Sequence, residues 1–281
     1  MVTKRISNLV LILISLLGLA LLLYPTVANQ WNQRHNSRAI ASYTELVKTV
    51  DDSKYVEMWK AARLYNQHIT DFTGHELTEE LRQEYESVLD PTGLGILGYV
   101  EIPSLKIDLP IYHGTSDSVL QIASGHLDWT NLPIGGVGTH CAISGHRGLS
   151  SAKLFTDLPQ LKKGDVFYIR VLDELLTYEV DHIATVWPWE LDALDRVEGK
   201  DYFTLITCTP YGINTHRLLV RGHRIANTEE ARHILVIADA LRIEPLLVAP
   251  ILAGPIVLTL IILVFLAPVP PPVEPKKGIK L

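Results

Sequence analysis

The sequence predicts a mainly β domain, a barrel or a sandwich, that follows a helical segment and lies between two membrane helices. Three features predict this class: an apolar segment near each end of the chain, helical periodicity before residue 70, and short β-branched runs from Gly98 onward.

Composition excludes several classes of protein. Hydrophobic residues make up 47% of the 281 residues and charged residues 20%, a balance unlike that of disordered chains. The 25 basic and 31 acidic residues give a net charge of −6, which offers no basic field for nucleic acid. Two cysteines, Cys141 and Cys208, leave no room for a disulfide framework or a four-cysteine zinc site.

The first apolar segment is expected to be a retained membrane span. No charge occurs between Arg5 and Arg34, and residues 9–24 are almost wholly aliphatic. Thr26-Val27-Ala28 resembles a signal-peptide cleavage site, but the long apolar run with its flanking Tyr24 and Trp31 favours an uncleaved anchor.

The second apolar segment, residues 246–267, contains no charge and is also expected to span a membrane. Its Pro250, Gly254 and Pro255 are tolerated better in a membrane helix than in a soluble one. Both short tails are basic, which places them in the cytoplasm and the middle of the chain outside the cell. The alternative, two buried core helices, is not favoured because neither segment has a polar face.

Between the spans, helices are expected first and strands afterwards. Apolar residues recur at helical intervals from Ser37 to His68, and a weaker helical pattern covers Thr228 to Leu241. Short β-branched runs separated by turn residues predict strands at 99–102, 111–112, 139–144, 166–171, 176–186, 202–207 and 218–225.

Cys208 is the candidate nucleophile. It closes the strand-like run 203–207 and precedes Thr209-Pro210, so it lies where a strand meets a surface loop. A thiol with a usual pKa of about 8.5 attacks as the thiolate and needs a cation or base nearby. Arg217 begins the next strand and would return toward Cys208 if the loop reverses the chain. An arginine cannot act as a base, so its role would be electrostatic.

His146 is the candidate base. It follows a strand-like run, and its neighbours Gly145 and Gly148 would permit close approach by a substrate backbone. His140 shares its strand parity, but a third metal ligand is missing on that face. Cys141 has the opposite parity to His146, which predicts a buried free thiol and not a disulfide with Cys208.

These residues lie in segments that resemble a known family. Residues 204–222, which begin Thr-Leu-Ile-Thr-Cys-Thr-Pro-Tyr-Gly, strongly resemble the segment of class C, or pilus-type, sortases that starts with their TLxTC signature. Residues 109–115, 138–140 and 144–149 are also similar to that family. The resemblance implies an eight-stranded β-barrel with an N-terminal helical extension. It implies Cys208 as nucleophile, His146 as general acid/base, Arg217 as third catalytic residue, and Thr207 as a substrate-binding residue.

The resemblance also implies a reaction and partners. Cys208 would attack the Thr–Gly carbonyl of an LPxTG-like sorting signal, and an amine, typically a pilin lysine, would resolve the thioester on a Gram-positive cell. No metal or organic cofactor is required. Two other interpretations remain open: a secreted cysteine peptidase, and a membrane-anchored binding domain without catalysis.

Class C sortases commonly carry a lid with an Asp-Pro-aromatic motif, and no complete motif occurs between Tyr65 and Tyr85. Asp71-Phe72 is the favoured degenerate lid, with Asp71 near Arg217 and Phe72 over the Cys208 thiol. Asp90-Pro91-Thr92 is the other candidate, and an ordinary loop is the alternative for both.

The expected organisation follows from these features. It comprises a tail and first span (1–28), a helical neck with the lid region (29–97), the sortase barrel (98–227), a connecting helix (228–245), a second span (246–268) and a cytoplasmic tail (269–281).

Overall fold

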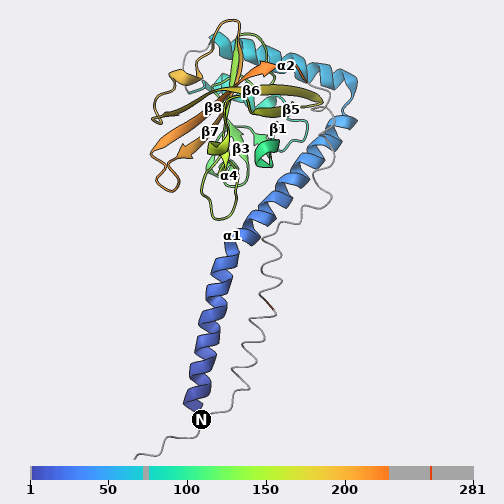
Figure 1. Cartoon of the computed structure of the whole chain (residues 1–281). Coiled ribbons are helices and arrows are strands. Elements are labelled where there is room, and N and C mark those ends of the chain that lie inside the picture. Colours follow the sequence, from blue (N-terminus) through green and yellow to red (C-terminus); the bar gives the residue numbers. More distant parts are fainter. Residues whose placement is uncertain (1, 72–75, 228–253, 255–281) are drawn as a thin grey trace, which may run out of the picture. The chain divides into compact units, whose positions relative to one another are not determined.

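A computed structural model of the chain describes residues 2–71, 76–227 and 254 (Figure 1). Internal contacts divide the chain into two units, and the β domain with the helices packed on it belongs to the unit of residues 27–241. The predicted connecting helix, second span and C-terminal tail lie outside the described residues, apart from Gly254.

The β domain is a closed barrel of eight strands in the order β1-β2-β3-β4-β7-β8-β6-β5. The barrel predicted from the resemblance is therefore confirmed, and the sandwich is not observed. The strands are β1 Ile96–Ile102, β2 Ile107–Tyr112, β3 Ser124–His126, β4 Thr139–Ser144, β5 Val166–Val171, β6 Glu174–Val186, β7 Asp201–Thr209 and β8 His216–Ile225.

The strand missed by the sequence analysis is β3. Its three residues, Ser-Gly-His, include no β-branched or large apolar side chain, so no local pattern marks them as a strand. Strand β3 forms because it pairs in parallel with β2 and antiparallel with β4.

Four α-helices are described: α1 Val2–Thr49, α2 Asp52–Asp71, α3 Glu79–Ser87 and α4 Asp117–Leu120. Single 3₁₀ turns cover Pro103–Leu105, Leu158–Gln160 and Asp192–Leu194. The helix expected from Ser37 to His68 is interrupted between α1 and α2. The Asp51 carboxylate accepts hydrogen bonds from the backbone N–H of Ser53 at 2.8 Å and from its hydroxyl at 2.6 Å, which starts a new helix.

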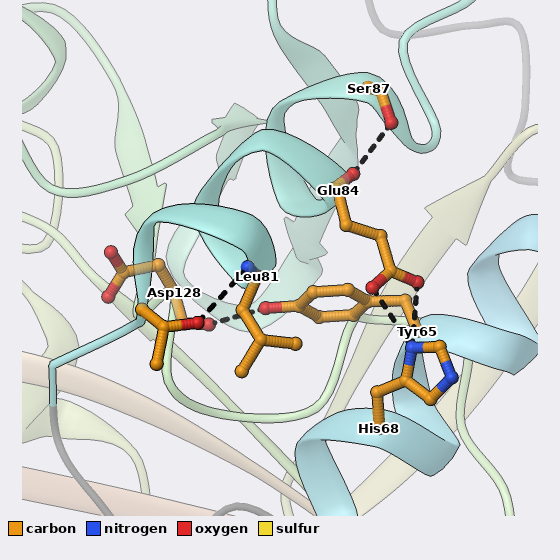
Figure 2. Close-up of polar contacts among 7 residues, drawn as sticks. Tyr65, His68, Leu81, Glu84, Ser87 and Asp128 are labelled. Atoms are coloured by element: carbon orange, nitrogen blue, oxygen red, sulfur yellow. Dashed lines mark hydrogen bonds and ion pairs between the residues drawn. The ribbon is translucent and has the colours of Figure 1, made fainter.

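The helices from residue 27 onward pack on the barrel through buried tyrosines. Tyr43 of α1 donates its hydroxyl to the Leu97 carbonyl at 3.0 Å and accepts from Leu172 N–H at 2.7 Å, which joins α1 to β1 and to the turn between β5 and β6. Tyr65 of α2 donates to the Asp128 carbonyl at 2.9 Å. Figure 2 shows this contact beside the His68–Glu84 pair, 2.9 Å apart, that joins α2 to α3.

Register assigns the side chains of β4, β7 and β8 to two faces. Cys141, Phe203 and Val220 belong to the main core and are 0 to 2% exposed. Ile206 and Leu219, which face each other across β7 and β8, belong to a second apolar cluster on the other face of the sheet. In Figure 1 the orange strands β7 and β8 lie side by side. This outer face carries the candidate site.

Within the described part of the chain, one helix is long and apolar enough to cross a membrane. It is α1 from Val10 onward, whose most apolar stretch has a mean hydropathy of 2.5 and is not buried. Length and composition therefore agree with the first predicted span.

Candidate active site

Strands β7 and β8 bring Cys208 and Arg217 together. The two residues are directly opposite each other in the antiparallel register, so their side chains leave the same face of the sheet. The loop between the strands reverses the chain, as the sequence analysis required. Both residues are partly exposed.

His146 lies just beyond the end of β4, which runs parallel to β7. The last paired positions are Ser144 and Ile206, and Gly145 N–H donates to the Ile206 carbonyl at 3.0 Å. Continuing both segments by two residues brings His146 level with Cys208. His146 is also partly exposed. The three predicted residues thus come from three segments that meet at one end of the barrel.

The glycines beside His146 lie close to aromatic rings of the protein itself. A Cβ at Gly145 would lie 2.6 Å from the Phe155 ring, and a Cβ at Gly148, where φ is +81°, would lie 3.1 Å from the Tyr211 ring. These glycines therefore leave room for neighbouring aromatic rings of the protein itself.

Thr207 faces the interior. Its side chain is 1% exposed, and its hydroxyl donates to the Gly145 carbonyl at 2.8 Å. This burial does not favour the expected substrate contact. The hydroxyl instead ties β7 to the segment that carries His146.

A groove of about 270 Å³ lies on the outer face and reaches Arg217. Its floor includes Ile206 and Leu219 from the strands that carry Cys208 and Arg217. Other lining residues come from the β6–β7 segment (Trp187, Pro188, Glu190, Leu191, Leu194) and from elsewhere (Thr115, Leu120, Leu127, Trp129, Ser144, Val186). A mostly apolar groove with few polar groups suits an extended peptide segment.

The sequence analysis did not identify the β6–β7 wall of this groove. Trp187 packs on His216 with ring centres 4.0 Å apart and planes tilted by 31°, and it stacks on Trp189 with ring centres 5.1 Å apart. Two tryptophans flanking a proline after a strand were the available signal, because exposed aromatic residues are enriched at binding surfaces.

His140, the rival histidine, is a structural residue. It is 1% exposed, its Nδ1 lies 2.9 Å from the Asp195 carbonyl, and its Nε2 lies 2.7 Å from the Thr204 hydroxyl. Burial lowers its pKa to about 4. Both ring nitrogens are engaged, so His140 holds the β6–β7 segment against β7. Among the residues that the structure describes, no group of His, Cys, Asp or Glu could hold a metal.

Cys141 is a buried free thiol, as predicted. It is 2% exposed within the main core, and both cysteines are free. Burial raises the pKa of this thiol well above its usual value. It is therefore kept in the unreactive protonated form and apart from the face that carries Cys208.

The two lid candidates differ in what can be described. Asp71 is the last residue of α2, and Phe72 lies outside the described residues. The Asp90 carboxylate accepts from Leu94 N–H at 3.2 Å and Gly95 N–H at 2.9 Å, which is the ordinary turn expected as its alternative.

Comparison with known proteins agrees with this geometry. A family model described as "Sortase domain" matches residues 100–225. The crystal structure of sortase C1 from Streptococcus agalactiae is 49% identical, with a TM-score of 0.66, and the match covers 68% of this chain and 100% of that chain. A structure of Clostridium perfringens sortase C with the C-terminal cell wall sorting motif is 43% identical, with a TM-score of 0.60 and coverage of 68% and 100%.

A curated relative, "Sortase A" of Streptococcus agalactiae serotype III (strain NEM316), is 34% identical over 119 residues. That match spans 41% of this chain and about half, 48%, of the relative.

Proposed function

The chain belongs to the sortase family of cysteine transpeptidases, in its class C, and we propose that it joins the acyl group of an LPxTG-like sorting signal to a pilin lysine. The observation that carries the proposal is the register of β7 and β8, which pairs Cys208 with Arg217, a residue that lines an apolar groove. His146 lies at the same end of the barrel, beyond β4.

The reaction is an acyl transfer in two steps. The Cys208 thiolate attacks the carbonyl of the Thr–Gly bond, the C–N bond breaks, and His146 protonates the leaving glycine amine. The acyl group then forms a thioester with Cys208. His146 takes a proton from the incoming lysine amine, which attacks the thioester carbonyl. The isopeptide C–N bond forms, the C–S bond breaks, and Cys208 leaves as the thiolate.

Arg217 supplies positive charge beside the reacting carbonyl. Each tetrahedral intermediate carries an oxyanion, which a guanidinium on the same face as Cys208 would stabilise. The apolar side chains of the sorting signal would occupy the groove beside it. The sorting motif in the Clostridium perfringens neighbour supports this substrate class.

We also propose that the enzyme is anchored in the membrane. The apolar segment of α1 would anchor the enzyme, with residues 246–268 as a second span and both basic tails in the cytoplasm. The catalytic barrel would then face secreted pilin subunits.

The test uses full-length protein in detergent with a sorting-signal peptide and a lysine-bearing acceptor peptide. Mass spectrometry should detect a thioester on Cys208 and a product that carries the acceptor amine. Cys208→Ala should form neither, whereas Cys141→Ala, a matched control at the buried thiol, should form both. Release of the acyl group to water alone would identify a peptidase, and absence of any thioester would leave a binding domain.

A further inference from the structure

Arg147 directly follows His146 and contacts the segment that follows Cys208. Its Nη1 donates a hydrogen bond to the Thr209 hydroxyl at 3.2 Å, and its guanidinium lies 5.6 Å from the centre of the Tyr211 ring. The second distance lies within the range of a cation–π contact. One side chain therefore joins the loop of the candidate base to the loop of the candidate nucleophile.

These contacts occur where the sheet no longer fixes the two segments. The paired positions of β4 and β7 end at Ser144 and Ile206, followed by the bond from Gly145 N–H to the Ile206 carbonyl. His146 lies beyond this point. Its own carbonyl accepts from Phe155 N–H at 3.1 Å, and side chains supply the direct links from its loop to the segment of Cys208. The Thr207 hydroxyl does so from the interior, at 2.8 Å from the Gly145 carbonyl.

Two features at Arg147 are unfavourable for folding. Its Nε is buried and has no hydrogen-bond partner among the described residues, which costs free energy. A Cβ at residue 148, where φ is +81°, would lie 3.1 Å from the Tyr211 ring and would force the ring or the chain to shift. Both features accompany the placement of the Arg147 side chain between the two loops.

We propose that Arg147 is a positioning residue that holds His146 in register with Cys208 by bridging to Thr209 and Tyr211. This inference rests on the proposed function, because it concerns the proton transfers assigned to His146. A displacement of reacting groups by about 1 Å can cost up to about a hundredfold in rate. Losing the bridge should thus slow the chemical steps without weakening substrate binding in the groove.

The test measures kcat and KM for peptide transfer by full-length protein in detergent. Arg147→Ala should lower kcat between about tenfold and a hundredfold, with KM changed less than about twofold. Thr209→Val removes the hydroxyl that accepts the hydrogen bond and should also lower kcat, whereas Thr209→Ser keeps a hydroxyl and should retain most activity. The loss in Arg147→Ala, Thr209→Val together should be smaller than the product of the two single losses.

Arg224 provides a matched control, because its guanidinium lies 5.7 Å from the Tyr178 ring, on parts of β8 and β6 away from Cys208. Arg224→Ala should keep the wild-type kcat. The proposal is overturned by an unchanged kcat in Arg147→Ala, by wild-type turnover in Thr209→Val, or by an equal loss in Arg224→Ala. If Arg147→Ala does not fold, the two Thr209 variants decide. Wild-type and Cys208→Ala protein assayed in parallel test the proposed function separately.

Discussion

At the scale of single residues, Arg217 combines a charge with a particular shape. Its guanidinium Nη1 donates to the carbonyls of Asn214 at 3.3 Å and His216 at 3.2 Å, so the turn between β7 and β8 orients it beside Cys208. A lysine would keep the positive charge but lose the planar set of donors.

We therefore expect Arg217→Lys to lower kcat by about a hundredfold, the size of effect seen when an oxyanion-stabilising donor is removed. Steady-state kinetics of peptide transfer check this. Arg221→Lys is the control, because Arg221 pairs with Asp181 at 3.0 Å elsewhere on β8 and should leave kcat close to the wild type. Near-normal turnover in Arg217→Lys would remove Arg217 from the oxyanion role.

Cys141 gives a second prediction at this scale. Its place in the main core and the outer position of Cys208 keep the two thiols on different faces of the sheet. Alkylation of denatured, unreduced protein should therefore count two free thiols in the full chain. A count of zero would indicate a disulfide and contradict the proposed nucleophile.

At the scale of elements, the β6–β7 segment forms a wall of the groove. Trp187 lines the groove and packs on the His216 ring. Trp187→Ala should raise KM for the sorting-signal peptide by about tenfold, since one well-packed aromatic contact contributes about 1.4 kcal/mol. Trp189→Ala is the control, because that ring is 71% exposed and should change KM less. Equal effects of the two changes would show that Trp187 has no special place in substrate binding.

The segment between α2 and α3 remains the proposed lid. Contacts on both sides hold the flanking helices, among them the His68–Glu84 pair in Figure 2 and the 2.9 Å bond from the Arg196 guanidinium to the Ile69 carbonyl. If Asp71 and Phe72 cover the nucleophile, Asp71→Ala with Phe72→Ala should raise the rate at which a small thiol reagent labels Cys208.

The comparison variant for the lid is Asp90→Ala, which alters the turn before β1 and should leave the labelling rate unchanged. The melting temperature of the double variant should stay close to the wild type. An unchanged labelling rate in the double variant would reject Asp71-Phe72 as the lid.

At the scale of the whole molecule, buried histidines make stability depend on pH. His126 is fully buried, with Nδ1 2.9 Å from the Tyr85 hydroxyl of α3 and Nε2 2.9 Å from the Asn131 carbonyl. This arrangement suits a neutral ring that accepts from Tyr85 and donates to Asn131. Burial lowers the pKa of His126 to about 3.

An unfolded histidine has a pKa of about 6.5, so the unfolded chain takes up a proton first as pH falls. Above about pH 6.5, protonation of His126 takes nothing from the free energy of unfolding. As pH falls from about 6.5 toward about 3, the free energy of unfolding decreases by up to about 1.4 kcal/mol per pH unit, because only the unfolded chain binds the proton. His140, whose pKa burial lowers to about 4, acts in the same direction.

Denaturant unfolding between pH 7 and pH 5 measures this slope. The free energy of unfolding of His126→Gln should fall less steeply with decreasing pH than that of the wild type, whatever its value at pH 7. His182→Gln, a change at an exposed histidine of β6, should keep the wild-type slope. An identical slope in His126→Gln would mean that the acid sensitivity arises elsewhere.

The sequence by itself determined the strands that carry β-branched runs, the candidate residues Cys208, His146 and Arg217, and the burial of Cys141. These features depend on local rules: side chains alternate along a strand, and turn residues mark where strands end. The helix break at Asp51 was also local, but two hydrogen bonds from Ser53 to the Asp51 carboxylate outweighed an uninterrupted apolar pattern.

Only the tertiary structure decided how distant segments meet. Strand β3 exists through its partners, Thr207 faces inward through register, and Trp187 forms a groove wall because it packs on His216. The same holds for Arg147, which lies beyond the end of β4 and whose partner Thr209 is the last residue of β7. Contacts between residues far apart in the chain depend on strand order and register, which periodicity along one segment does not encode.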